Sequence, residues 1–463
     1  MMKIKHFTWI VLFVGFIINV KILNCADISW DDFEDINQED KRSVSVLGGK
    51  LIDAVYEENL SKIKKLISQG ASVNQCDKYD NCALEIATKI CNLAIIRYLI
   101  EKGANIKSGL LGTAVYYCHP PSRFKVVKYL ATQKTVISDY DNKGVVAAAQ
   151  VGDIEIIKYL ITKGFKVNGK KQGEKTALMK AAEYSHKEIF KYLVTQGATI
   201  TDEDKTGKTV LMYASMGSSK EIVEFLVHKG VDIHKRDREG KTAFMYACES
   251  GRFESAKFLM SQGKIDLNEK DKSGDTVFMI TAVRGPYKLV KFLKELGANI
   301  NEVNAEGNNA LMEILSKSGE YEDRRLTRNE IINYLIDSGI DLKAINKEGE
   351  SVLHRRFHAM NKHSVLDIPE VKKLVEKGAP LNIKDKNGMT FLMIAIKDPA
   401  ADRIVIVNHN QKISFLDFTK YLVEKGLDLN VKDNEGKTLL MYAMKYRAHD
   451  QALIRYLTQK EKK

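Results

Sequence analysis

Three glycine–lysine–threonine triplets are the first residues of this sequence whose types suggest a chemical role. They are Gly207-Lys208-Thr209, Gly240-Lys241-Thr242 and Gly436-Lys437-Thr438. Each matches the end of a phosphate-binding loop, whose backbone amides and lysine hold phosphate groups. That loop also needs a glycine five residues before its last glycine, and the chain has Asp202, Lys235 and Val431 there. We therefore interpret the triplets as turns and predict no nucleotide or other cofactor.

Three histidines form the second candidate for chemistry. His354 and His358 are four residues apart, as two metal ligands on one face of a helix are, and His363 follows closely. The sequence contains no spaced cysteine pairs, no nucleophile elbow and no zinc-protease histidine motif. We predict no catalytic residues, and return to His354 once its place in the chain is clear.

A repeated sequence pattern, clearest between Lys175 and Gly274, indicates the elements on which such residues lie. Three copies follow one another at a period of about 33 residues. Glycines and threonines recur in register in the copies, at Gly197, Gly230 and Gly263 and at Thr176, Thr209 and Thr242. A fixed period of this length is typical of stacked repeats, in which one unit cannot bury its apolar face alone.

The second copy shows how one unit should fold. Gly207 allows a turn with positive φ, and Thr209 is placed to cap a short helix. Ser218 and Glu221 have the spacing of a capping box, which predicts the start of a second helix at Ser218. Gly230 suits the end of that helix, and an extended finger should lead to the next copy.

This arrangement of finger, helix, turn and helix resembles the ankyrin repeat. The family pattern D-x-x-G-x-T-P-L-H-x-A-A, followed by G-H-x-E-I-V-K-x-L-L and a glycine, is matched by Asp204, Gly207, Thr209, Leu211, Ala214, Glu221, Ile222, Val223, Leu226 and Gly230. The family proline is replaced by Ala177, Val210 or Ala243, and the family histidine by Met179, Met212 or Met245. We expect apolar packing to replace the usual threonine–histidine hydrogen bonds.

The resemblance implies an all-α solenoid of about twelve helix-turn-helix units with extended finger loops over residues 47–463. His354 falls at the family's histidine position, which favours a structural role over a metal site. Two ladders support the count and are expected in the core. The first, on the second helices, comprises Tyr98, Tyr129, Tyr159, Tyr192, Phe225, Phe258, Phe292, Tyr334, Tyr421 and Tyr456. The second, on the first helices, comprises Met179, Met212, Met245, Met279, Met312, Met393 and Met441.

The late repeats are longer than the period. Their additional residues lie between the two helices of a unit, at 316–328, 359–368 and 397–417. Insertions in a solenoid go to loops on one side of the stack. Two interpretations stay open, which are drift in exposed turns and a shared binding edge.

The N-terminal residues indicate export. Residues 1–26 combine a positively charged start with an apolar core too short to span a membrane, as in a secretion signal peptide. Ile22-Leu23-Asn24-Cys25 resembles a loose, spirochaete-like bacterial lipobox, which would make Cys25 a lipidation site; ordinary cleavage after Ala26 is the alternative. Residues 27–46 form an acidic tether. The protein is therefore expected in the periplasm, lipid-anchored in the cell envelope, or secreted.

The positions of the cysteines do not predict a disulfide framework for the repeats. Cys76 and Cys82 flank one finger and could pair in an oxidising compartment, so their disulfide state stays open. Cys118 and Cys248 lie at or next to small buried positions of first helices and are expected to be core thiols.

Function follows from the resemblance, because ankyrin repeat proteins generally bind other proteins through finger tips and the concave face of the first helices. We expect a monomeric, non-enzymatic scaffold for an unidentified protein partner. The matched positions are Lys205, Thr206, Lys208, Met216, Arg238, Glu239, Lys241, Glu249, Ser250, Lys272, Ser273, Asp275, Val283 and Arg284.

Two alternative functions would place the protein in a different functional class. A net charge of +12 would suit a binder of anionic polymers or surfaces, although lysine is spread along every repeat and export argues against nucleic acid. An enzyme would need a site in the late insertions, for example around His358, His363 and His409.

Overall fold

The computed structural model describes residues 46–461 except 78, 108, 134–141, 170–172, 318–324, 359–367 and 398–413. The chain divides into two compact units, Met1–Ser138 and Asp139–Lys463, and each is described by itself. The expected signal peptide, Cys25, nearly all of the acidic tether, His363, His409 and the central parts of the three insertions lie outside the described residues.

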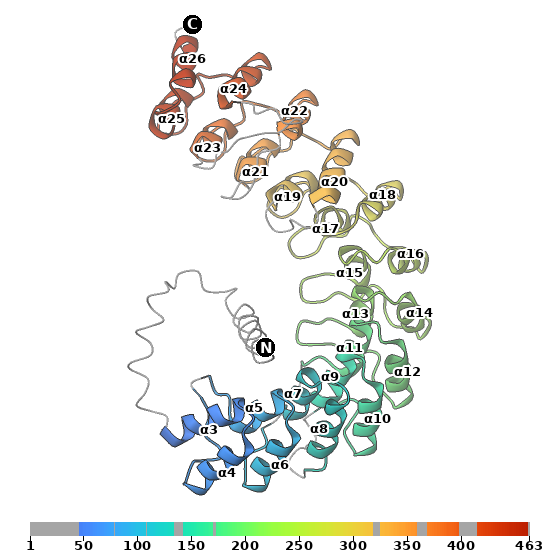
Figure 1. Ribbon diagram of the computed structural model, residues 1–463. Coiled ribbons are helices and arrows are strands. Elements are labelled where there is room, and N and C mark those ends of the chain that lie inside the picture. The colour runs from blue at the N-terminus through green and yellow to red at the C-terminus, as the bar shows by residue number, and fades with distance from the viewer. Residues whose placement is uncertain are drawn as a thin grey trace, which may run out of the picture. The chain divides into compact units, whose positions relative to one another are not determined.

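The described residues of the first unit contain three helix pairs, labelled in Figure 1. The first helices are α3 (Val46–Tyr56), α5 (Ala83–Lys89) and α7 (Leu110–Tyr117), and the second helices are α4 (Leu60–Ser68), α6 (Leu93–Glu101) and α8 (Ser122–Leu130). Each first helix packs on its own partner, and α5 also packs on both α3 and α7. The core between them is aliphatic.

In the second unit, the part of the chain that the structure describes contains nine helix pairs. Its first helices are α9 (Lys143–Val151), α11 (Ala177–Glu183), α13 (Val210–Met216), α15 (Ala243–Glu249), α17 (Val277–Arg284), α19 (Ala310–Ser316), α21 (Val352–His358), α23 (Phe391–Lys397) and α25 (Leu439–Tyr446). Its second helices are α10 (Ile154–Thr162), α12 (Lys187–Thr195), α14 (Lys220–His228), α16 (Phe253–Ser261), α18 (Tyr287–Glu295), α20 (Arg325–Asp337), α22 (Ile368–Glu376), α24 (Phe415–Glu424) and α26 (Gln451–Glu461).

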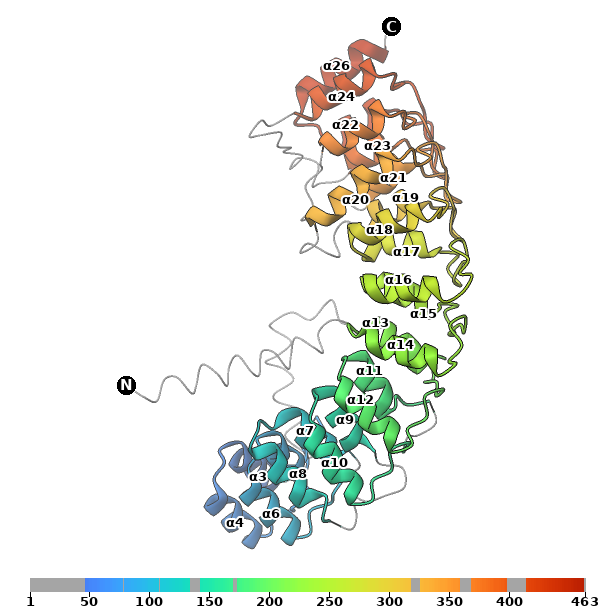
Figure 2. The same ribbon diagram turned by 90° about the vertical axis from the view of Figure 1, so that its right-hand side faces the viewer.

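Successive first helices of the second unit contact one another from α9 to α25, so the pairs form a one-dimensional stack. Figure 2 shows the loops between its pairs gathered along one edge. With the first unit, the described residues contain twelve helix pairs and no strand, which confirms the predicted all-α solenoid. None of the described helices is long and apolar enough to cross a membrane.

The local signals of the repeat are largely confirmed in α13 and α14. The Thr209 hydroxyl accepts a hydrogen bond from the Met212 amide at 3.2 Å, as an N-cap should. Gly207 and Gly230 have φ values of 80° and 79°, which only glycine adopts without strain.

The expected cap at Ser218 is wrong by one residue. Ser219 caps α14, and its hydroxyl accepts a hydrogen bond from the Ile222 amide at 3.4 Å. The physical reason lies in the preceding pair, because Ser185 Oγ accepts hydrogen bonds from the amides of both Ser218 and Ser219, at 2.6 and 3.1 Å. This contact between repeats fixes the turn before the second helix starts.

The methionine ladder is buried at six of its seven positions, from Met179 to Met393. The Met212 sulfur also accepts a hydrogen bond from the Thr209 amide at 3.4 Å, so methionine completes the helix cap in place of the family's histidine. The expectation that the ladder lies in the core is wrong at Met441, whose side chain is 53% exposed. It lies on α25, and no later first helix of the described residues packs on it.

His354 has the expected structural role. It is fully buried; Ser351 Oγ lies 2.9 Å from its Nδ1, and its Nε2 lies 3.1 Å from the Met389 carbonyl oxygen in the next pair. Burial lowers the pKa of the imidazole, which favours the neutral form.

The aromatic ladder is not in the core, and this prediction is wrong at all ten positions. Every ring is half-buried, and the fully buried residue is the leucine that follows it, for example Leu226 after Phe225. The stripe that packs on the neighbouring helices consists of Ile222, Val223 and Leu226, and Phe225 lies at its margin. Its ring meets Phe190 of the preceding pair edge-on, with centroids 5.7 Å apart.

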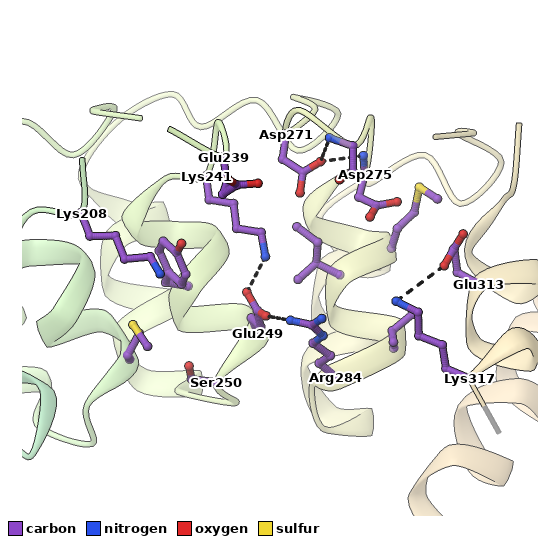
Figure 3. A pocket seen from close by; sticks show the side chains of 16 residues that line it. Lys208, Glu239, Lys241, Glu249, Ser250, Asp271, Asp275, Arg284, Glu313 and Lys317 are labelled. Carbon is purple, nitrogen blue, oxygen red and sulfur yellow. Dashed lines mark hydrogen bonds and ion pairs between the residues drawn. The ribbon is translucent and has the colours of Figure 1, made fainter. Parts of the chain in front are cut away.

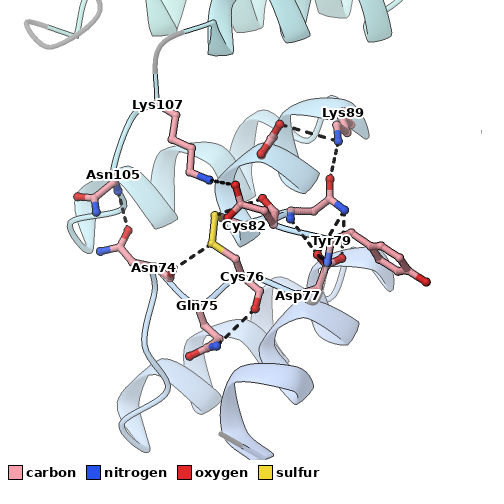
Figure 4. The surroundings of a disulfide bond; sticks show 12 residues. Asn74, Gln75, Cys76, Asp77, Tyr79, Cys82, Lys89, Asn105 and Lys107 are labelled. Atoms are coloured by element: carbon pink, nitrogen blue, oxygen red, sulfur yellow. Dashed lines mark hydrogen bonds and ion pairs between the residues drawn. A yellow bond between two sulfur atoms is a disulfide. The ribbon is translucent and has the colours of Figure 1, made fainter. Parts of the chain in front are cut away.

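Cysteine behaves differently in the two units. Two disulfides lie in the first unit, Cys76–Cys82 and Cys91–Cys118, and Figure 4 shows the first of them beside Asn74 and Lys107. Cys118 is therefore buried but is not the expected thiol, because packing of α5 on α7 brings Cys91 to it across 27 residues. Cys248 is a buried thiol as predicted, and burial raises its pKa.

An aspartate organises each regular finger turn. Asp204 Oδ1 accepts hydrogen bonds from the amides of Thr206 and Lys208, at 2.7 and 3.0 Å. The hydroxyl of Tyr213 on α13 donates a third hydrogen bond to Oδ2 at 2.7 Å. Burial alone would raise the pKa of this carboxyl, but the hydrogen bonds from Tyr213 and Thr206 hold it below its ordinary value. The same bond joins Tyr246 to Asp237 and Tyr442 to Asp433.

Backbone hydrogen bonds join each finger to the next. The Arg238 amide donates to the Thr206 carbonyl at 2.8 Å, and the Lys272 amide donates to the Glu239 carbonyl at 2.9 Å. The series continues with Ala305 and Ser273 at 2.9 Å. The finger tips are therefore held in a fixed register relative to one another.

The first prediction compares the contributions to stability of the buried Leu226 and of the half-buried ring of Phe225 beside it. Leu226→Ala should lower the free energy of unfolding by about 2–5 kcal/mol, because it empties a fully buried site. Phe225→Ala should cost only about 1–2 kcal/mol, because part of the ring is already exposed. Chemical denaturation measures both, and hydrogen exchange should show faster opening mainly in α12, α14 and α16. An equal or larger cost for Phe225→Ala contradicts the assignment.

The second prediction concerns the finger turn. Tyr213→Phe should destabilise the protein by about 1.5–3 kcal/mol, because it removes a hydrogen bond to a buried carboxylate. The folded-state pKa of Asp204 is depressed, so this contribution should be complete above the unfolded pKa of about 3.9 and disappear as the pH falls through the folded value. Denaturation as a function of pH tests it. Tyr192→Phe, on a half-exposed ring, is the control, and a loss of the same size there would refute the role of Tyr213.

Candidate functional site

A hollow of about 450 Å³ lies on the first helices of the second unit. Its walls come from α13, α15, α17 and α19 and from the fingers that precede the first three of these helices, as Figure 3 shows. Ten of the fourteen positions predicted from the sequence line it: Lys208, Met216, Glu239, Lys241, Glu249, Ser250, Ser273, Asp275, Val283 and Arg284. The repeat register therefore brings together residues up to 76 positions apart.

The other four predicted positions do not line the hollow. Lys205, Thr206, Arg238 and Lys272 lie at the finger tips, where three of their amides and the Thr206 carbonyl form the hydrogen bonds between fingers. The side chains of Lys205, Arg238 and Lys272 are exposed to solvent. They form a basic row beside the hollow rather than part of its wall.

Glu249 is the central charged group of the hollow. Lys241 Nζ lies 2.9 Å from its carboxylate, and Arg284 of the next first helix forms a second ion pair with it. Burial by itself would raise the pKa of Glu249, but the hydrogen bonds and charges of Lys241 and then Arg284 hold it below the ordinary value. The two cations come from the finger of the same repeat and from the next repeat, so this cluster also joins neighbouring units.

A second group of carboxylates lies toward α19. Asp275 accepts a hydrogen bond from the Asn304 amide group at 2.9 Å, and the same amide nitrogen lies 3.0 Å from Glu313. Burial raises the pKa of Asp275, and the negative charges of Glu313 and Asp271 add to this shift. This side of the hollow is therefore acidic, whereas Lys208 lies on the opposite side, 5.1 Å from the ring centre of Tyr246.

Six lining residues were missed in the sequence: Tyr246, Asp271, Met279, Ile280, Glu313 and Lys317. The repeat register contained the signal for several of them. Ile280 and Glu313 occupy the position of Tyr246 in later repeats, and Lys317 occupies the position of Arg284. Extending the matched positions by one repeat would have included Lys317, whereas Glu313 lies at a helix position that was not among those matched.

One group of the described residues has the composition of a metal site. Cys76, Asp80 and Cys82 lie close together, but the two cysteines are joined in a disulfide and their thiolates are not free as ligands. His354 uses both ring nitrogens in structural contacts, and His358 lies 3.3 Å from Glu350.

The lining of the hollow suits recognition of a polypeptide. It offers carboxylates and cations, an aromatic ring, and apolar contact from Met216 and Val283. Such a mixture can bind the side chains and backbone of a partner at once, as protein interfaces do.

Comparison with known proteins agrees with this architecture. A family model described as ankyrin repeats, three copies, matches residues 51–142, 145–237, 202–271 and 231–304, which together exceed half of the chain.

Three curated relatives also match parts of the sequence. An ankyrin repeat and KH domain-containing protein of Caenorhabditis briggsae is 30% identical over 130 residues, which are 28% of this chain and 5% of that protein. An ankyrin repeat-containing protein of Caenorhabditis elegans is 40% identical over 55 residues, 12% of this chain and 5% of its own length. An ankyrin repeat protein of Acanthamoeba polyphaga mimivirus is 32% identical over 107 residues, 21% of this chain and 18% of its own length.

This chain therefore covers only a small part of the length of each relative. The repeat geometry, the finger turns and the family match lead to one conclusion. The chain belongs to the ankyrin repeat family.

Proposed function

We propose that this protein is a non-enzymatic scaffold that binds a partner protein through the hollow on α13, α15, α17 and α19 and the adjoining finger tips. The observation that carries the proposal is the hollow itself, because three successive fingers and four first helices build it. The ankyrin repeat family consists generally of protein-binding scaffolds, which is consistent with this role.

The geometry favours a polypeptide partner of which short side chains or a loop enter the hollow. A volume of about 450 Å³ accommodates only a few side chains, and the exposed row of Lys205, Arg238 and Lys272 adjoins it. Hydrogen bonds between fingers and the ion pairs of Glu249 hold the surface in place before binding. A surface ordered in advance loses less conformational entropy when a partner binds.

We propose in addition that the protein is exported and anchored through lipidated Cys25. The signal-like residues 1–26 support export. Two disulfides in the first unit are also consistent with an oxidising compartment outside the cytoplasm. Cleavage after Ala26, which would release a secreted or periplasmic protein, is the competing route.

A photo-crosslinking residue tests the binding face directly. Placed at Ser250, which lines the hollow, it should capture one defined protein in intact cells; at Lys257, on the outer side of α16, it should not. Val283→Asp should reduce capture at Ser250 at least about tenfold, because it places an unpaired charge among apolar contacts.

Lys257→Asp is the matched control for that variant and should leave capture at Ser250 unchanged. Equal capture from Ser250 and Lys257, or capture that Val283→Asp does not alter, would contradict binding through the hollow.

Lipid anchoring has a separate test. In detergent phase partition the native protein should enter the detergent phase, and Cys25→Ser should move it to the aqueous phase. A native protein that is already entirely aqueous would rule out lipidation and favour cleavage after Ala26.

A further inference from the structure

The second helices of the first unit form a strongly basic face. The segments α4, α6 and α8 contain seven lysine and arginine residues but a single acidic residue, Glu101. Figure 1 shows the three helices in sequence along one side of this unit, opposite α3, α5 and α7. The exposed cations of this basic face are Lys64, Lys65, Arg97, Lys102, Lys125 and Lys128.

Aromatic rings, rather than carboxylates, lie next to several of these cations. Lys64 on α4 and Lys102 at the end of α6 each lie 5.6 Å from the ring centre of Tyr98. Arg97 on α6 lies 5.2 Å from the ring centre of Tyr129 on α8. A ring attracts a cation without cancelling its charge, so the contacts order these side chains and leave the face positive.

The second helices of the second unit instead contain nearly equal numbers of basic and acidic residues. Several of their lysines form ion pairs with these acids: Lys158–Glu155 at 3.1 Å, Lys187–Glu221 at 2.7 Å and Lys220–Glu224 at 2.8 Å. Cation–ring contacts occur there too, as between Lys163 and Tyr159, so the difference between the two units lies in the acidic residues. The aromatic ladder therefore lies on a nearly neutral surface in the second unit and on a basic surface in the first unit. This difference is not a general consequence of the repeat.

We propose that the basic face of α4, α6 and α8 binds a membrane surface that contains anionic lipids. Lysine and arginine near such a surface are attracted by its negative potential, and the attraction adds over several residues. Tyrosine rings and long cationic side chains also suit the boundary between lipid headgroups and water.

Two features favour lipid over nucleic acid. Bases bind to proteins by stacking on open aromatic faces. Tyr98 is half-buried, and Lys64 and Lys102 already contact its ring, so the ring is not open for stacking. Lipid phosphates need only the charges, which extend outward from the rings. The proposal is independent of partner binding by the hollow, because the two surfaces belong to different units.

Vesicle sedimentation of the full chain tests this proposal. Vesicles of phosphatidylcholine alone are compared with vesicles in which part of the lipid is phosphatidylglycerol. The wild-type chain should bind the anionic vesicles at least about tenfold more tightly at low salt, and the preference should shrink at high salt. Insertion of the apolar N-terminal run would contribute to both vesicle types and does not produce this preference.

Charge variants locate the binding face. The triple variant Lys64→Glu, Arg97→Glu, Lys102→Glu should lose the preference for anionic vesicles. The matched variant Lys158→Glu, Lys191→Glu, Lys257→Glu has the same net charge on the outer helices of the second unit and should stay within about twofold of wild type. A third variant, with glutamine at the first three positions, should lie between them, and circular dichroism and thermal unfolding verify that all are folded.

Three results would overturn the proposal. The first is equal binding of wild type to both vesicle types, and the second is an equal loss in the two glutamate variants, which would indicate net charge alone. The third is tight binding to a homopolymeric RNA that the Lys64, Arg97 and Lys102 variant loses while anionic vesicles bind no better than neutral ones. That result would assign the same face to nucleic acid.

Discussion

A helix pair of this protein cannot cover its own apolar surface, and the rest of the structure depends on that constraint. The residues Ile222, Val223 and Leu226 are buried because neighbouring pairs lie on both sides of α14. Met441 occupies a position that is buried in six other pairs, yet it is 53% exposed where no later first helix of the described residues follows. Stability in such a stack comes from nearest neighbours, so any surface of useful size must extend over several repeats.

The finger turns convert this stacking into a defined surface. Asp204 and Asp237 each fix a turn through two backbone amides and a tyrosine hydroxyl. Backbone hydrogen bonds then connect one turn to the next, and Glu249 joins Lys241 of its own finger to Arg284 of the following helix. The hollow is consequently a product of contacts between repeats and has its shape before any partner binds.

Much of this could be predicted from the sequence, because a feature that recurs at a fixed period is determined within the repeat. Thr209, Gly207 and Gly230 act locally and were placed correctly. Phe225 was not, because the ladder shows that an aromatic residue recurs but not which side of the helix packs against a neighbour. The pattern fixes the position of a side chain along the chain, whereas burial depends on the partner helix.

The remaining differences arise from contacts between repeats, which a single motif does not contain. Ser185 shifts the second helix cap from Ser218 to Ser219, and packing of α5 on α7 converts Cys118 from an expected thiol into a disulfide partner of Cys91. Ten site residues emerged from matched repeat positions, whereas Glu313 and Lys317 belong to a fourth repeat that was not included in the match.

The central claim is that the first helices and finger turns of the second unit form the protein-binding surface. Hydrogen exchange measured with and without the partner captured through Ser250 tests this most directly. Protection should increase in the finger turns around Asp204, Asp237 and Asp271 and in α13, α15, α17 and α19, while α14, α16 and α18 stay unchanged. Protection confined to α14, α16 and α18 would contradict the account.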